Sequence, residues 1–197
     1  NDPEVNAIYI ATPPDSHAQY TRMAAEAGKA VYVEKPMAKT YAECLSMIQV
    51  CKLWDVPLFT AYYRRQLPNF LKIKSLLSEG IIGDIRYVNI MLNKTLHPDI
   101  LGANGSKSNW RILPEISGGG YFFDLACHQL DILDFLFGPI QDATGFAFNQ
   151  SSQYAAEDIV AGSFYFNNKI IGQGNWCFTT SGISDKEMTT IVGSKGQ

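Results

Sequence analysis

One apolar stretch, residues 121–137 (YFFDLACHQLDILDFLF), carries three polar side chains at helical spacing. Asp124, His128 and Asp131 stand at positions i, i+4 and i+7, so a helix places them on one stripe. Burying such a stripe costs several kcal/mol unless the groups are paired or face a wet cleft. Because an imidazole can give or take a proton near neutral pH, His128 is a candidate acid or base. The alternative is a structural histidine that is hydrogen-bonded to Asp124 inside the core.

Three further groups of polar residues lie where short apolar segments end in the first third of the chain. They are Thr12-Pro13-Pro14-Asp15-Ser16-His17, Glu34-Lys35-Pro36 and Tyr62-Tyr63-Arg64-Arg65. Open α/β sheets bind their ligands at the carboxyl ends of strands. A lysine at such a place, Lys35, can donate a hydrogen bond to a developing alkoxide. Each group also has a plainer interpretation: a helix cap beside an exposed His17, a solvated loop lysine, and a basic turn.

Trp110 and Arg111 lie in a glycine-rich segment just before the polar stripe. An aromatic face can stack on a sugar ring, and an arginine fork can hold hydroxyls or carboxylates. Alternatively, Trp110 only fills a domain junction. The triple glycine at 118–120 lets the backbone approach another segment closely. A cleft between two domains would collect all of these groups, and clefts of this kind commonly hold active sites.

The elements that must position these groups begin with short apolar strands alternating with helices. Strands are predicted at 5–10, 30–34 and 57–61, and helices at 16–27 and 40–55. This alternation is typical of βαβ units with a parallel sheet. A doubly wound sheet normally has about five or six strands, and its phosphate-cradling glycine loop is absent here because the first glycine is Gly28. We therefore expect residues 1–62 to be the C-terminal part of a dinucleotide-binding domain whose first half lies upstream.

After residue 62 the pattern changes to longer, alternating strands. Helices are predicted at 67–79 and 121–137, strands at 84–93, 140–149, 158–167, 169–180 and 187–192, and loops over 94–120. Asn167-Asn168 predicts a tight hairpin turn, and strands joined by hairpins predict an antiparallel sheet. The expected fold class is α/β followed by α+β, with domains at 1–62 and 63–197.

Composition limits the classes of partner. The chain has 197 residues, of which 46% are apolar and 18% charged, and its formal net charge is −3. It lacks the basic footprint of nucleic-acid or anionic-membrane binding, and no apolar run approaches the roughly 18 residues of a membrane span. The four cysteines form no Cys-x-x-Cys pair, which favours buried free thiols over a disulfide framework or a metal site. We expect no nucleic acid, membrane or metal partner, and a cytoplasmic location unless an export signal lies upstream.

Three stretches together resemble one enzyme family. AIYIATPPDSHAQY, VYVEKPMA and SGGGYFFDLACHQLDILDFLFG are similar to motifs of the glucose–fructose oxidoreductase / inositol dehydrogenase / rhizopine-catabolism (Gfo/Idh/MocA) family of nicotinamide-dependent oxidoreductases. The resemblance covers nearly the whole chain. It implies a partial Rossmann domain followed by a domain with a large open antiparallel sheet, which commonly forms the oligomer interface. It also implies that the end, IVGSKGQ, is a mid-sheet point, so that the chain is cut short at both ends.

The resemblance implies roles for individual residues. Lys35 would be the active-site lysine, Asp124 the substrate-binding aspartate and His128 the catalytic histidine. The residues implied at the nicotinamide end of the cofactor site are Thr12, Pro13, His17, Glu34, Lys35 and Pro36.

The match also covers the segment after the third strand, with departures. Arg65 and Pro68 match the arginine and proline of the family's Asn-x-Arg-x-x-Pro stretch. Residues expected to bind substrate are Arg65, Trp110, Arg111 and Asp124. Tyr63 and Pro14 stand where the family often has Asn, and Ala126 stands where Gly is frequent.

The implied reaction of the intact protein is hydride transfer between a sugar or polyol carbinol carbon and NAD or NADP. His128 would remove the hydroxyl proton, Lys35 would stabilise alkoxide character, and Asp124 would hold the substrate or tune His128. Two alternatives stay open: an NAD-dependent oxidation–elimination that cleaves glycosides, and a non-catalytic sugar-binding or assembly module. We expect residues 1–197 alone to be inactive, and the intact protein to be a homo-oligomer through the antiparallel sheet.

Overall fold

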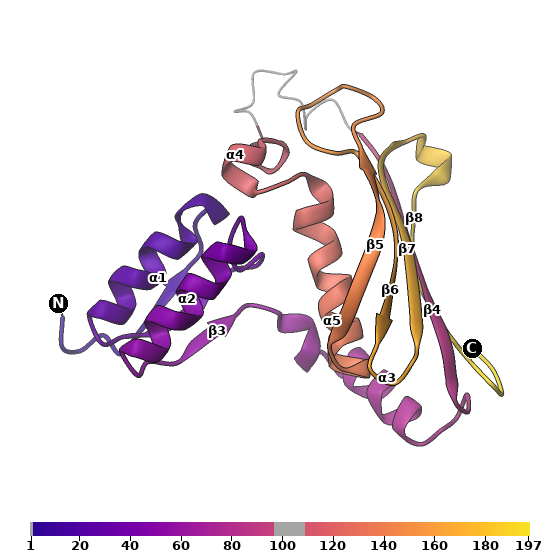
Figure 1. Cartoon of the computed structure of the whole chain (residues 1–197), viewed down its shortest axis with the longest axis horizontal. Helices are drawn as coiled ribbons and strands as arrows, with labels where there is room; N and C mark the ends of the chain where they lie inside the picture. The colour runs from indigo at the N-terminus through magenta and orange to yellow at the C-terminus, as the bar shows by residue number, and fades with distance from the viewer. Residues whose placement is uncertain (1, 97–108) are drawn as a thin grey trace.

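The computed structural model describes residues 2–96 and 109–197 and contains two sheets (Figure 1). Part of the loop predicted over 94–120 lies outside these described residues. The first sheet has three strands in the order β1-β2-β3, and the second has five in the order β5-β6-β7-β4-β8. Among the described residues, no helix is both long and apolar enough to cross a bilayer.

The first sheet is parallel, as predicted. Its strands are β1 (Ala7–Ile10), β2 (Ala30–Val33) and β3 (Leu58–Thr60). The connecting helices, α1 (His17–Glu26) and α2 (Tyr41–Leu53), lie side by side, and the short turn η1 (Pro14–Ser16) leads into α1 (Figure 1). Thr40 begins α2 with a capping box, because its hydroxyl accepts from Glu43 N–H while the Glu43 carboxylate accepts from Thr40 N–H.

The two faces of this sheet differ. Ile10, Val31 and Val33 point into a core shared with Met47 and Cys51 of α2. Alternate residues point the other way, and register aligns Tyr9, Tyr32 and Phe59 in one exposed row. Helices thus cover one face of the three strands, and an aromatic row marks the other.

The second half begins with the turn η2 (Tyr63–Gln66) and helix α3 (Pro68–Ser78). Pro68 occupies the first turn of α3, where a backbone N–H would have no acceptor within the helix, so the lack of one in proline costs nothing. The remaining elements are β4 (Ile85–Thr95), η4 (Trp110–Ile112), α4 (Pro114–Ser117), η5 (Phe122–Ala126), α5 (Cys127–Phe137), β5 (Ile140–Phe148), β6 (Ile159–Phe166), β7 (Ile171–Thr180), η6 (Gly182–Ser184) and β8 (Lys186–Gly193). The division at residue 62 stays a prediction.

The five-stranded sheet is mixed: three of its four strand pairs are antiparallel, as expected, and one pair is parallel. β5, β6 and β7 pair antiparallel, as predicted from the Asn167-Asn168 turn, and β4 pairs antiparallel with β8. β4 and β7, however, run parallel. A parallel pair needs a long crossover, and the chain between β4 and β7 supplies one that includes α5.

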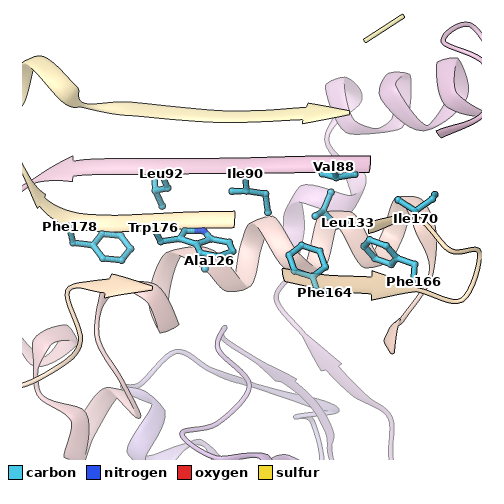
Figure 2. Packing of buried hydrophobic residues seen from close by; sticks show 10 residues of the cluster. All are labelled: Val88, Ile90, Leu92, Ala126, Leu133, Phe164, Phe166, Ile170, Trp176 and Phe178. Carbon is cyan, nitrogen blue, oxygen red and sulfur yellow. The ribbon is translucent and has the colours of Figure 1, made fainter. Parts of the chain in front are cut away.

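The core of the second half lies between this sheet and α5 (Figures 1 and 2). Leu133 of α5 is 1% exposed and packs among Phe164 and Phe166 of β6, together with Val88 of β4. Ala126, which is 0% exposed, lies beside Trp176 of β7 (Figure 2). The sheet therefore fixes the helix that carries the polar stripe.

The stretch predicted as one helix over 121–137 begins with a π-helical turn, η5, before it continues as α5. The main-chain carbonyl of Asp124 lies in this turn and accepts a hydrogen bond from Lys35 Nζ at 3.0 Å. A side chain that enters the carbonyl ladder of a helix is a known cause of such irregularities. The contact joins sequence positions far apart, so a helical pattern within 121–137 could not reveal it.

The triple glycine permits two close approaches, as predicted. Gly118 has a φ of +86°, and a Cβ there would lie 2.7 Å from the Lys39 Cα. A Cβ on Gly120 would lie 2.8 Å from the Ala156 Cβ. The glycines thus bring the start of the helix against both the first half and the loop before β6.

Charged contacts fix η2 against α5 within the second half, and another contact joins the first half to the second. Arg65, in η2, donates to Asp131 Oδ1 on α5 through Nε at 2.9 Å and also contacts Asp134 Oδ2 at 3.1 Å. The Asp131 side chain is only 6% exposed, and burial raises its pKa while Arg65 opposes that rise. Lys39 Nζ donates to the Glu115 carbonyl at 3.0 Å.

The cysteine prediction is confirmed in part. All four cysteines are free thiols, but only Cys51 is fully buried, whereas Cys44, Cys127 and Cys177 are half-buried.

Leu133→Ala should lower the free energy of unfolding by about 2–5 kcal/mol, because it opens a cavity beneath the helix that carries the site. Urea unfolding followed by circular dichroism measures the loss. The matched control is Leu53→Ala, at a residue that is 79% exposed, which should change stability by less than about 0.5 kcal/mol. Equal losses in the two variants would contradict the assignment of Leu133 to the core.

Arg65→Met should destabilise the protein by roughly 2–4 kcal/mol at pH 7, because it leaves the buried Asp131 carboxylate without its counter-ion. The loss should shrink as pH falls, since protonated Asp131 needs no counter-ion and its pKa rises further without Arg65. Urea unfolding at pH 7 and pH 4.5 measures both effects. Arg86→Met, which removes an exposed ion pair with Asp84, should stay within about 0.5 kcal/mol at either pH.

Candidate functional site

The Asp124 carboxylate is where the predicted site residues meet. Lys35 Nζ lies 2.7 Å from Asp124 Oδ1, and Arg111 Nε lies 3.2 Å from Oδ2. The Asp124 side chain is 11% exposed, so each oxygen of a nearly buried carboxylate has its own cation. The pair of Lys35 and Asp124 links the end of β2 to the start of the helix that carries His128.

Lys35 is held in place by residues of neighbouring strands. Its main-chain N–H donates to Glu34 Oε2 at 3.1 Å, and the hydroxyl of Tyr9, on β1, donates to Glu34 Oε1 at 2.5 Å. The Tyr9 pKa is raised, chiefly by this hydrogen bond. Glu34 thus joins the ends of two parallel strands and orients the lysine that follows it.

His17 is not exposed, so the interpretation of its segment as a helix cap beside an exposed histidine is wrong. Its side chain is fully buried, with Nδ1 3.1 Å from the Pro36 carbonyl and Nε2 2.8 Å from the Thr12 carbonyl. The ring therefore ties the loop after β1 to the loop after β2. It has no exposed edge to offer a ligand, and its observed contacts are those of a residue that positions both loops.

The two other residues expected near the cofactor after β1 remain accessible. Thr12 is exposed and its hydroxyl accepts from Ser16 Oγ at 2.7 Å, while Pro13 is half-buried. Pro36 is buried beside His17.

His128 lies on α5, one helical turn after Asp124, and is 5% exposed. The alternative of a histidine bonded to Asp124 is wrong, because the hydrogen bonds of Asp124 go to Lys35 and Arg111 and the His128 Nδ1 is buried with no partner among the described residues. Tyr62 and Tyr63 meet the ring nearly at right angles, with centroids 6.3 and 5.6 Å away.

The surroundings of His128 favour its neutral form. Burial is the main cause that lowers its pKa to about 4, and the positive charges of Lys35 and Arg64 add to it. At neutral pH the ring is therefore unprotonated and can accept a proton.

Of the residues expected to bind substrate, Arg111 contacts Asp124 directly with Trp110 beside it, whereas Arg65 contacts other carboxylates. Arg111 stacks on Trp110, with its guanidinium carbon 4.4 Å from the ring centroid, and reaches Asp124 from the same side. Both interpretations of Trp110 therefore survive, as a platform or as a filler. Arg65 donates hydrogen bonds to Asp131 and Asp134, so its observed role is to neutralise these carboxylates.

The described residues suit one end of a dinucleotide. Thr12, Glu34 and Lys35 offer hydroxyl, carboxylate and ammonium groups at the carboxyl ends of adjacent parallel strands, where open α/β sheets bind their ligands. No glycine-rich turn joins a strand of the parallel sheet to a helix within the described residues, and Gly28 follows α1. The phosphate cradle is therefore not supplied by these residues.

Sequence reasoning missed a polar group on the far side of His128. Trp176 Nε1 donates to Gln129 Oε1 at 2.7 Å, and Gln129 Nε2 donates to Glu187 Oε1 at 3.5 Å. Arg64 Nη1 lies 3.8 Å from the same oxygen. Only adjacency to His128 in the sequence could have singled out Gln129, and nothing local marks Glu187.

Comparison with known proteins identifies both halves. Residues 1–62 match the model of the oxidoreductase family with an NAD-binding Rossmann fold, and residues 70–197 match the model of the GFO/IDH/MocA C-terminal domain. The chain is 38% identical to Oxidoreductase P35 of Formosa agariphila over 98% of its length and 58% of that protein. It is 33% identical to levoglucosan dehydrogenase of Pseudarthrobacter phenanthrenivorans over 70% of its length and 34% of that protein.

Solved structures agree with these matches. The WlbA dehydrogenase of Bordetella pertussis, crystallised with NADH and UDP-GlcNAcA, superposes with a TM-score of 0.86 at 26% identity, over 98% of this chain and 54% of that one. The aldose-aldose oxidoreductase of Caulobacter crescentus, complexed with glycerol, gives 0.80 at 26% identity, over 98% and 55%. The chain thus spans little more than half of these proteins. Its two matching domain models, and its 38% identity to a relative, show that it belongs to the Gfo/Idh/MocA family of oxidoreductases.

Proposed function

We propose that the protein containing these 197 residues transfers hydride between the carbinol carbon of a sugar or polyol and NAD or NADP. The observation that carries the proposal is the ion pair of Lys35 with Asp124, which brings an ammonium group from a strand end to the turn before His128. The similarity to a levoglucosan dehydrogenase and to an aldose-aldose oxidoreductase supports a sugar substrate.

His128 is the proposed base. Its ring is neutral at pH 7, so it can take the hydroxyl proton as the carbinol carbon gives up hydride. A nicotinamide ring supplies the hydride acceptor when it is bound. The products of sugar oxidation are then a carbonyl compound, the reduced nicotinamide and a proton held at first by His128.

In this proposal, Lys35 and Asp124 act on the substrate hydroxyl oxygen from the side opposite His128. An ammonium donor stabilises negative charge that develops on the substrate oxygen. Asp124 holds that ammonium in place, and together with Arg111 it offers partners for neighbouring hydroxyls. Thr12, Pro13, Glu34 and Pro36 are proposed to border the nicotinamide, with His17 behind them.

The outer face of the mixed sheet is the proposed oligomer interface. It exposes Tyr87, Phe146, Phe148, Tyr165 and Ile171, of which Tyr87, Ile171 and Tyr165 stand in one cross-strand row. An exposed apolar set of this size on one face is typical of association surfaces.

The experiment that tests the proposed function uses the protein expressed from its complete reading frame. Incubation with NAD or NADP and a panel of aldoses and polyols should produce reduced nicotinamide, which absorbance detects. Tightly retained NAD with no net reduction, accompanied by glycoside cleavage, would instead indicate oxidation–elimination. No cofactor binding at all would sink the proposal and favour a sugar-binding module.

His128→Asn in that protein should lower turnover at least about a hundredfold, because the variant loses the base. Steady-state kinetics with the best substrate of the panel measures the loss. The matched control is Lys72→Gln at an exposed position of α3, outside the site and the proposed interface, which should keep near-native turnover. Near-native turnover of His128→Asn would refute the role proposed for His128.

His128 should also make stability depend on pH. The folded pKa of about 4 lies below the unfolded value, so between roughly pH 6.5 and pH 4 the unfolded chain binds a proton that the folded chain does not. The free energy of unfolding should therefore fall as pH drops from 7 to 4.5. His128→Asn should remove on the order of 1–2 kcal/mol of that fall. Identical pH dependence in the variant and the native chain would contradict a buried, neutral His128.

A further inference from the structure

His128 borders a small cavity whose lining does not include Asp124 or its two cations. The cavity has a volume of about 140 Å³ and is bounded by α3, α5, η2 and the C-terminal strand β8. Most of its wall is apolar, and its polar members are His128, Gln129, Arg64, Glu187 and Thr189. An arginine and a glutamate therefore share one confined space with the ring of the proposed base.

The glutamate is held in this place by neighbours from other elements. Gln129 is 6% exposed and uses both ends of its amide, accepting from Trp176 Nε1 at 2.7 Å and donating to Glu187 Oε1 at 3.5 Å. The same Glu187 oxygen lies 3.8 Å from Arg64 Nη1. Although the Glu187 side chain is 52% exposed, its carboxylate is thus directed at Arg64 by a chain of contacts that starts in the core.

The charges near His128 divide into two groups, called front and rear here: those outside the cavity lining and those that line it. Lys35, Asp124 and Glu34 lie in front, where the negative groups oppose the effect of the lysine on the ring. Arg64 lies at the rear with Glu187 as its counter-ion, while Asp131, one turn further along α5, is already paired with Arg65. Tyr62 and Tyr63 complete the surroundings with edge-on rings. The rear pair has no part in the proposed chemistry.

We propose that Arg64 and Glu187 together are positioning residues for His128, so that strand β8 contributes to the site through a charge pair behind the base. Arg64 alone would bring a full positive charge into the space next to the imidazole and resist proton uptake. Glu187 offsets that charge and leaves His128 able to accept a proton. The pair therefore sets the basicity of the ring from the cavity that it shares with His128.

This inference deepens the proposed function, because a positioning role matters only if His128 is the base. Its physical content is the coupling between three side chains, which can be measured without turnover. NMR titration of the histidine ring protons in the 197-residue chain reads that coupling directly, and His128→Asn assigns the signal. A failure of the titration test would refute the positioning role of Arg64 and Glu187, but it would not refute the hydride-transfer proposal.

Glu187→Gln should lower the midpoint of the His128 titration by roughly half a unit or more, because Arg64 is then unbalanced. Arg64→Gln should raise it by a similar amount, since a cation is removed and a carboxylate remains. Arg64→Lys, which keeps the charge, should stay near the native midpoint, and the double variant Arg64→Gln/Glu187→Gln should return toward it. Asp84→Asn, which removes an exposed carboxylate paired with Arg86, is the matched control and should leave the midpoint unchanged.

Acid unfolding would not prevent the measurement. If the chain opens before His128 is titrated, the same coupling is read from the pH dependence of the unfolding free energy of Arg64→Gln, which should fall less between pH 7 and pH 4.5 than that of the native chain. Combined with His128→Asn, the Arg64→Gln effect on that pH dependence should vanish. Midpoints that do not move in Glu187→Gln and Arg64→Gln, or that move in the opposite directions, would overturn the proposal.

Discussion

Asp124 and Asp131 bring negative charge into a helix whose other faces are buried, and that charge must be balanced before the two halves can close. Each carboxylate obtains a cation from outside its own helix: Lys35 for Asp124 and Arg65 for Asp131. An unpaired carboxylate at either position would cost several kcal/mol. The first contact joins the two halves, the second fixes η2 against α5, and both set the geometry around His128, so that stability and the candidate site have a common origin.

The neutral state of His128 follows from this arrangement. A buried ring beside two tyrosines has lost most of its water, and the positive charges of Lys35 and Arg64 add to the penalty for protonation. A base in such surroundings is unprotonated at neutral pH, and it accepts a proton when the charge near it changes. A substrate oxygen that loses its proton is a change of that kind. The electrostatics of the junction thus suit a proton that moves together with a hydride.

Much of this could be predicted from the sequence, because the signals are local. Apolar runs between helices indicated a parallel three-stranded sheet, Asn167-Asn168 indicated a hairpin, and the motif spacing singled out Lys35, Asp124 and His128. The failures concern long-range contacts. The parallel pairing of β4 with β7 depends on how a crossover returns to the sheet, and local pattern carries no information on that. The buried position of His17 depends on carbonyls contributed by two separate loops, and the role of Glu187 depends on a strand near the end of the chain.

The π-helical turn at Phe122–Ala126 has one residue more than an α-helix of the same rise needs. Deletion of a single residue there would let the segment relax into regular helix, with the hydrogen-bond ladder intact. The backbone would tolerate the change, but everything before the deletion would rotate by about 100° relative to α5. Asp124 would then leave Lys35 while His128 kept its place. The extra residue of this turn thus sets the register at which Asp124 meets Lys35, and that one register serves both the closure of the two halves and the candidate site.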